Sequence, residues 1–170
     1  MIKKTTLNAI SKHCPCSGGW ETLLNNLNKT EADDEPLSLM TILESNGIKD
    51  AVWALRCFDY LDFCLFLADV AESILHKHEE SNDPKAPRLA IQAIRDYKLG
   101  KIGKEQLIEA AEAAESIVYQ SYVADAAFYY TDATDTINAA AYSAPLVSAD
   151  ARSKKWKEIE IIFIKHFNGE

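Results

Sequence analysis

Residues that could bind a metal or act as nucleophiles stand together near the start of the chain, where His13 is followed by Cys14, Pro15 and Cys16. A zinc site usually takes its ligands from two such pairs of wider spacing, and no second pair follows here. The proline and the close spacing favour a turn with buried thiols. Metal binding or redox chemistry at this turn is the alternative interpretation.

Other groups with catalytic potential are spread along predicted helices. His76 and His78 are two residues apart, so on a helix they point to nearly opposite sides and cannot hold one ion. The acidic row of Glu105, Glu109 and Glu112 is typical of a solvated helix face. No recognisable nucleophile motif and no glycine-rich phosphate loop occurs. We therefore predict no catalytic, cofactor-binding or metal-binding residues, and expect the protein not to be an enzyme.

Two carboxylates, Asp62 and Asp69, interrupt an otherwise apolar segment that runs from residue 60 to residue 78. An unpaired buried carboxylate is costly, so each must either meet a cation or face water. Facing solvent is the favoured interpretation. The alternative is an ion pair, for which the candidate cations are Arg56, Arg88 and Arg95.

The charge of the 170-residue chain is −8 and is unevenly distributed. Residues 31–83 hold thirteen acidic and three basic side chains. Such a field repels nucleic acid and anionic membranes and favours a basic partner, although an acidic surface can also serve solubility alone. The polar residues after Met1 and the lack of a long apolar run predict neither a signal peptide nor a membrane span. We expect a soluble, cytoplasmic protein with reduced cysteines.

The pattern of apolar residues, caps and breakers predicts an all-α fold. The chain is expected to form one domain over residues 1–170, in which short helices of a subregion 1–56 pack on a bundle of longer, antiparallel, alanine-rich helices over 57–170. Helices are predicted over about 5–12, 20–27, 37–45, 50–58, 60–78, from 84 to before 100, 104–130, 131–143 and 148–167.

Local signals mark the connections between these helices. Proline and paired glycine predict a turn over residues 13–19, and residues 28–36 form a polar, acidic connection. Gly47 is expected to end one helix, Asp50 to cap the next, and a kink is expected near Asp59.

Motif-like stretches span nearly the whole chain. Residues 7–56 read Leu-Asn-Ala-Ile-x-Lys-His-x-Pro-Cys-Ser-x-Gly-Trp, then Ala-Asp-Asp-Glu-Pro-Leu, then Ile-Leu-Glu-Ser-Asn-Gly and Asp-Ala-Val-Trp-Ala-Leu-Arg. This stretch resembles a segment common in phage and prophage proteins. Residues 57–167, with Asp-Pro-x-x-Pro-Arg-x-Ala-Ile and alanine-rich helices, resemble a family of bacterial immunity proteins.

The resemblance implies a helical protein of a mobile element that neutralises a toxin or inhibits a defence system, as anti-CRISPR proteins do. An acidic surface would then block a basic nuclease or a subunit of a defence complex. The residues predicted to bind the partner are Trp20, Glu31, Asp33, Asp34 and Glu35. Two alternatives remain: a phage accessory enzyme with its site around His13 and Cys16, and a self-associating structural component of a phage particle.

Overall fold

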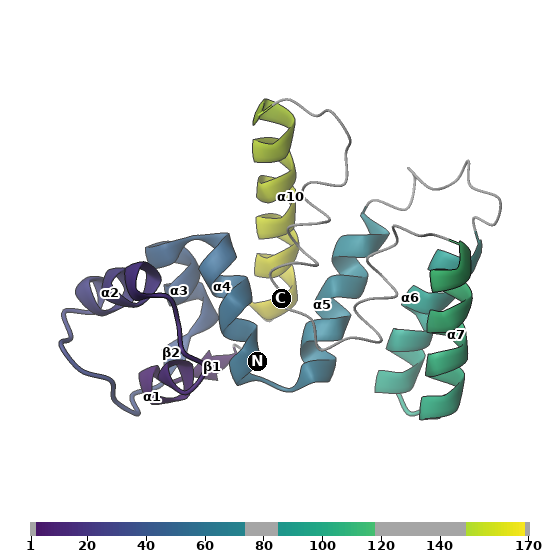
Figure 1. Ribbon diagram of the computed structural model, residues 1–170, viewed down its shortest axis with the longest axis horizontal. Helices are drawn as coiled ribbons and strands as arrows, with labels where there is room; N and C mark the ends of the chain where they lie inside the picture. Colours follow the sequence, from purple (N-terminus) through teal and green to yellow (C-terminus); the bar gives the residue numbers. More distant parts are fainter. Residues whose placement is uncertain (1–2, 74–84, 118–148, 169–170) are drawn as a thin grey trace. The chain divides into compact units, whose positions relative to one another are not determined.

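A computed structural model describes residues 3–73, 85–117 and 149–168 and shows an all-α fold, as predicted (Figure 1). The helices are α1 (Leu7–Ser11), α2 (Ser17–Asn26), α3 (Leu39–Asn46), α4 (Ile48–Trp53), the 3-10 helix η1 (Ala54–Cys57), α5 (Tyr60–Glu72), α6 (Lys85–Lys98), α7 (Lys104–Ile117) and α10 (Ala149–Phe167). Among these described helices, none combines the length and the apolar character that a membrane crossing needs.

The chain divides into two compact units. The first comprises Met1–Tyr60 together with Trp156–Glu170, and the second comprises Leu61–Lys155. The predicted organisation as one domain, with a boundary near residue 56, stays a prediction. Three predictions lie outside the described residues. They are the alanine-rich helix over 131–143, the end of the helix over 104–130, and a helix cap at residues 83–84.

The first unit contains a short strand pair that the sequence did not predict. Strands β1 (Lys4–Thr5) and β2 (Leu37–Ser38) are antiparallel, with Lys4 opposite Ser38 and Thr5 opposite Leu37. Each strand leads directly into a helix, because Thr6 caps α1 and Ser38 caps α3. A capping residue has an extended backbone, so both approaches to these helices have the geometry that pairing needs.

Helices in this unit begin and end through local hydrogen bonds. Thr6 Oγ1 accepts a bond of 3.0 Å from Ala9 N. At the end of α2, Asn28 has a φ of 54°, and Lys29 N donates to Leu24 O over 2.9 Å. Together with the bond from Asn28 N to Asn25 O, this is a Schellman motif, which turns the chain out of the helix. Gly47, with a φ of 83°, ends α3 as predicted.

Helix α2 begins earlier than predicted. We expected a turn through Gly19 and a helix from Trp20, but the helix starts at Ser17 and both glycines lie in its first turn. Glycine in a helix costs about 0.5–1 kcal/mol relative to alanine. A Cβ at this residue would lie 2.6 Å from Asp50 Oδ2 of α4. Glycine is favoured at this position because it has no Cβ. The long-range contact therefore overrides the local preference.

The role predicted for Asp50 was also wrong. Gly47 is the N-cap of α4, and Asp50 lies in the first turn of that helix. An acidic side chain is favourable there because of the helix dipole. The kink predicted near Asp59 is confirmed, since η1 gives way to an extended Phe58 and α5 begins at Tyr60.

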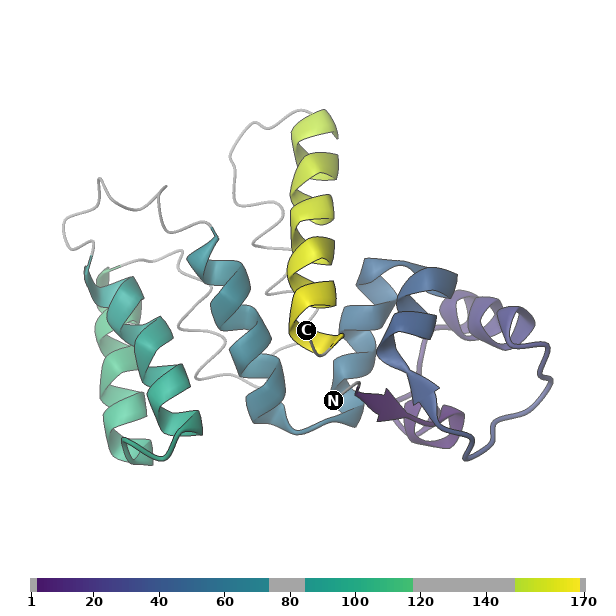
Figure 2. The ribbon, with the colours of Figure 1, turned by 180° about the vertical axis from the view of Figure 1, so that it is seen from behind.

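The core of the first unit is formed by aliphatic side chains. Helices α2, α3 and α4 pack in sequence order, and α1 packs on η1; these elements are seen from behind in Figure 2 (purple and blue). On α10, Ile159, Phe163 and Phe167 are buried. The other buried residues include Leu7, Ile10, Leu23, Leu39, Ile42, Leu43, Val52 and Leu55.

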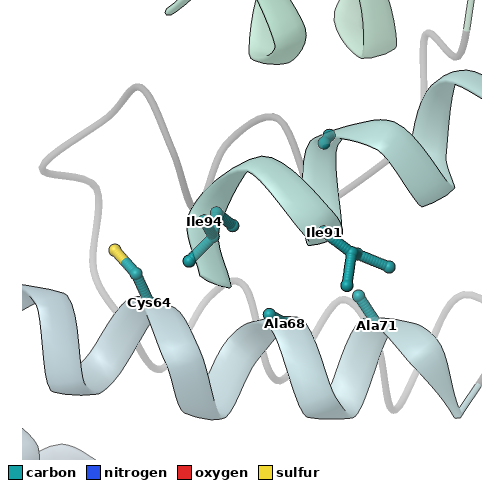
Figure 3. Packing of buried hydrophobic residues seen from close by; sticks show 6 residues of the cluster. Cys64, Ala68, Ala71, Ile91 and Ile94 are labelled. Carbon is teal, nitrogen blue, oxygen red and sulfur yellow. The ribbon is translucent and has the colours of Figure 1, made fainter. Parts of the chain in front are cut away.

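The second unit is built on α5, α6 and α7. Side chains of α5 and α6 pack into one hydrophobic cluster, and Ile91 and Ile94 of α6 point toward α5 (Figure 3). The cluster comprises Cys64, Ala68, Ala71, Ala90, Ile91 and Ile94. Ala90 and the two isoleucines are buried and form the inward face of α6. At its end, Gly100 has a φ of 67° and forms a second Schellman motif.

Both carboxylates of α5 that we expected to face solvent meet cations of α6. Asp69 Oδ1 lies 2.8 Å from Arg95 Nη2, one of the predicted cations, although the pair is only half-buried rather than buried. Asp62 Oδ1 lies 3.4 Å from Lys98 Nζ, a partner that was not predicted. The solvent-facing interpretation holds in part, because the side chain of Asp69 stays 36% exposed beside Arg95, whereas that of Asp62 is 16% exposed.

Candidate functional site

The first unit contains a pocket of about 140 Å³. Its lining residues come from α1, the turn before α2, α2 itself, α3, α4 and η1. They are Ile10, Pro15, Cys16, Gly19, Trp20, Leu23, Ile42, Asn46, Asp50, Trp53 and Ala54. Most of this lining is apolar. Among these lining residues, Asp50 is the one with a formal charge. The pocket is therefore an apolar space with one carboxylate.

A hydrogen-bond junction holds that carboxylate in place. Asn46 Nδ2 donates to Gly19 O over 2.7 Å and to Asp50 Oδ2 over 2.8 Å. The Ser45 hydroxyl donates to Asn46 Oδ1, which sets the orientation of the amide. One amide thus ties the end of α3 to α2 and to α4. The junction positions Asp50 independently of any ligand.

Two tryptophans contribute aromatic surface to the pocket. Trp20 of α2 and Trp53 of α4 are both half-buried. The guanidinium of Arg56 lies over the Trp53 ring, 4.9 Å from its centroid. A cation over an indole ring is attracted by the ring's negative face. This unit therefore already uses stacking of a guanidinium on tryptophan at the edge of the site.

The predicted partner-binding residues separate into two groups. Trp20 lines the pocket, whereas Glu31, Asp33, Asp34 and Glu35 do not. Lys29 Nζ lies 2.5 Å from Asp33 Oδ2 and 2.5 Å from Glu35 Oε2. The hydrogen bond from Lys29 lowers the pKa of Asp33, and the same contacts raise the pKa of Lys29. Part of the acidic connection is therefore neutralised within the chain.

Asp33 also has a structural role in this connection. Its backbone carbonyl accepts a bond of 3.0 Å from Asn8 N of α1, and its Oδ1 accepts one of 3.1 Å from Glu35 N. Glu31 and Asp34 are exposed, and no ion pair to either occurs among the described residues. Glu31 and Asp34 are thus the acidic side chains of the connection that remain available to a partner.

The turn that carries the thiols does not bring its candidate residues together as one site. Cys16 lines the pocket, but His13 is exposed and is not among the lining residues. Cys14, with a φ of 54°, and Cys16 are both exposed, so the predicted burial of the two thiols was wrong. Within the described parts of the chain, no three His, Cys, Asp or Glu side chains converge so that they could hold a metal ion. The other two cysteines differ in burial, since Cys64 is buried and Cys57 is half-buried.

Sequence reasoning missed three of the residues that define the pocket. In the sequence, Asn46 precedes the glycine that ends a helix, Asp50 stands where a cap is expected, and Trp53 lies among apolar residues. The available signal was the spacing of four between Asn46 and Asp50, but Gly47 separates two helices there, so helical periodicity could not be applied.

No family model matches the chain, and no curated protein or solved structure shows significant similarity to it. The function must therefore be argued from the pocket and from the charge of the chain.

Proposed function

We propose that the protein is a non-enzymatic binding protein, an inhibitor or immunity-type protein of a phage or another mobile element, which blocks a basic partner. A nuclease or a subunit of an anti-phage defence complex would be such a partner. The proposal extends the resemblance noted in the sequence.

The observation that carries the proposal is the half-buried pair Trp20 and Trp53 at one pocket with the carboxylate of Asp50. Tryptophan is enriched among the residues that contribute most to protein–protein binding, and these cluster in concave, desolvated places. A pocket whose walls are mainly apolar and whose formal charge is negative suits a basic projection of another protein.

Charge supplies the second part of the argument. The chain carries a net charge of −8, and Glu31 and Asp34 are exposed. Complementary charge mainly raises the association rate and discriminates against acidic partners. In this proposal the acidic connection attracts the partner, and the tryptophan pocket supplies the contacts that slow its release.

The test is affinity capture from host lysate treated with nuclease, comparing the wild type with Trp20→Ala and Ile161→Ala. Ile161 is an exposed apolar residue of α10, 65% exposed, and does not line the pocket, so it is a matched control for loss of apolar surface. The proposal expects a stoichiometric basic protein with the wild type and the control, and binding weakened by at least about tenfold with Trp20→Ala.

The purified partner then has to be inhibited by the wild-type protein. An acidic or variable set of captured proteins, equal capture by Trp20→Ala, or a partner whose activity is unaffected would each contradict the proposal.

A further inference from the structure

We infer that the pocket between α2 and α4 is a receptor for a single arginine side chain, which is supplied by the partner. The inference rests on the proposed function, because it names the chemistry by which a basic partner is recognised. It is argued from the pocket's walls, its carboxylate and its aromatic rings.

The walls suit an aliphatic stem. Ile10, Leu23 and Ile42 are buried and line the pocket, so the space beside them is apolar. Arginine and lysine bury their methylene groups along apolar surface while their charged ends seek a polar partner. A pocket of about 140 Å³ is on the scale of one side chain rather than of a folded segment.

Asp50 supplies the partner for the charged end. Its Oδ2 accepts the bond from Asn46, and no hydrogen bond to its Oδ1 occurs among the residues that the structure describes. A half-buried carboxylate has lost part of its hydration, so an arriving cation would recover favourable interaction energy there. Because Asn46 already orients the group, little conformational entropy is lost on binding.

The tryptophans favour arginine over lysine. A planar guanidinium stacks on aromatic faces and donates a fork of hydrogen bonds to a carboxylate, whereas an ammonium is a compact, strongly hydrated charge. Arg56 already stacks on Trp53. The incoming guanidinium is therefore assigned to Trp20, over which no cation lies among the described residues.

The experiment uses the full-length protein labelled with ¹⁵N, in which the indole N–H groups of Trp20, Trp53 and Trp156 report separately. Trp156 is a built-in control, since it does not line the pocket and carries Lys49 over its ring at 5.2 Å. The probe is N-acetyl-arginine methylamide. The comparison probes are the lysine analogue and the citrulline analogue, which has nearly the shape of arginine without its charge.

The inference expects a saturable shift of the Trp20 signal with millimolar affinity, and much smaller shifts at Trp156. The citrulline probe should bind at least about tenfold more weakly, because it lacks the charge-assisted hydrogen bonds to Asp50. The lysine probe should bind about threefold more weakly, because it cannot stack as a plane. Equal binding of arginine and citrulline, or no shift at Trp20, would overturn the inference without the use of any variant.

A pair of variants tests the carboxylate itself. Asp50→Asn should reduce arginine binding at least about tenfold, whereas Glu44→Gln should leave it unchanged, because Glu44 is exposed on α3 and does not line the pocket. Undiminished binding by a folded Asp50→Asn protein would contradict the inference.

The two proposals fail in different ways. Capture of a basic partner that depends on Trp20, without any response to the arginine probe, would overturn the inference and leave the binding function standing. Specific arginine binding without capture of any basic protein would support the pocket and overturn the proposed function.

Discussion

Asp50 Oδ2 lies 2.6 Å from the point that a Cβ of Gly19 would occupy. At Gly19 the backbone of α2 therefore lies so close to the carboxylate of α4 that a side chain at this position would clash with it. Asn46 bridges the same two residues through one amide nitrogen. The position of the carboxylate thus depends on a glycine that lies thirty-one positions before it in the sequence.

Gly19→Ala should destabilise the protein by about 1 kcal/mol, because the clash with Asp50 outweighs the gain in helix propensity. The matched control is Gly18→Ala in the same turn of α2, where nothing lies within 4 Å of the added Cβ. This control should stabilise the protein by about 0.5 kcal/mol. Urea unfolding of both variants measures the difference, and an equal gain in both would show that Gly19 is not required by packing.

Neutralising Glu31 and Asp34 should slow association with the basic partner more than neutralising Asp33 and Glu35. The latter two already share Lys29, so part of their charge is compensated within the chain. We expect a roughly threefold lower association rate for Glu31→Gln/Asp34→Asn at low salt, and a smaller difference at high salt. Stopped-flow mixing measures these rates. A larger effect of the Asp33→Asn/Glu35→Gln variant, in a protein that keeps its fold, would contradict the prediction.

Thr5→Val should raise the free energy of unfolding by about 1 kcal/mol, because Thr5 Oγ1 is buried and makes no well-formed hydrogen bond among the described residues. The thiol of Cys57, whose pKa is raised mainly by burial, interacts with this hydroxyl only weakly, since sulfur is a poor hydrogen-bond partner.

Thr6→Val is the control for this substitution. Thr6 is the adjacent threonine, and its hydroxyl caps α1 through Ala9 N. Its loss should lower stability by about 1 kcal/mol. Thermal unfolding of the two variants should therefore move the midpoint in opposite directions, and a loss of stability in both would contradict the interpretation of Thr5.

Acidic pH should lower the stability of the second unit because it protonates Glu72. Arg95 donates two bonds to this carboxylate, 3.3 Å to Oε1 and 2.6 Å to Oε2, and these bonds hold the pKa of Glu72 below its ordinary value of 4.5. Because the pKa of Glu72 is lowered in the folded state, the stabilisation by its pair with Arg95 is complete at a pH above the pKa of the unfolded state. The stabilisation is lost as the pH falls through the pKa of the folded state. The side chain is 52% exposed, so screening by solvent limits the effect to about 0.5 kcal/mol.

Glu72→Gln should therefore reduce stability at neutral pH and show a flatter loss of stability below about pH 4.5 than the wild type. The control is Glu109→Gln on the exposed side of α7, which should follow the wild-type curve. Denaturant unfolding across the acidic range measures both. Parallel curves for Glu72→Gln and the wild type would show that the pair with Arg95 contributes no pH dependence.

The sequence by itself determined the helical class and most of the places where helices begin and end. Gly47 ends α3 as predicted, and Thr6 caps α1, because a cap is made by bonds to residues three or four positions away. The buried face of α6 was likewise predictable, since helical periodicity alone places Ala90, Ile91 and Ile94 together.

Only the tertiary structure decided which polar groups meet. Glycine is favoured at position 19 because a carboxylate of α4 occupies the space beside it, and no local rule contains that contact. Asp69 pairs with Arg95, twenty-six residues away, because two helices pack through small side chains. The same reason explains why one pocket is lined by Trp20, Asn46 and Asp50. Hydrogen bonds and close contacts between distant residues depend on how the helices pack. Sequence spacing encodes only the contacts within a helix.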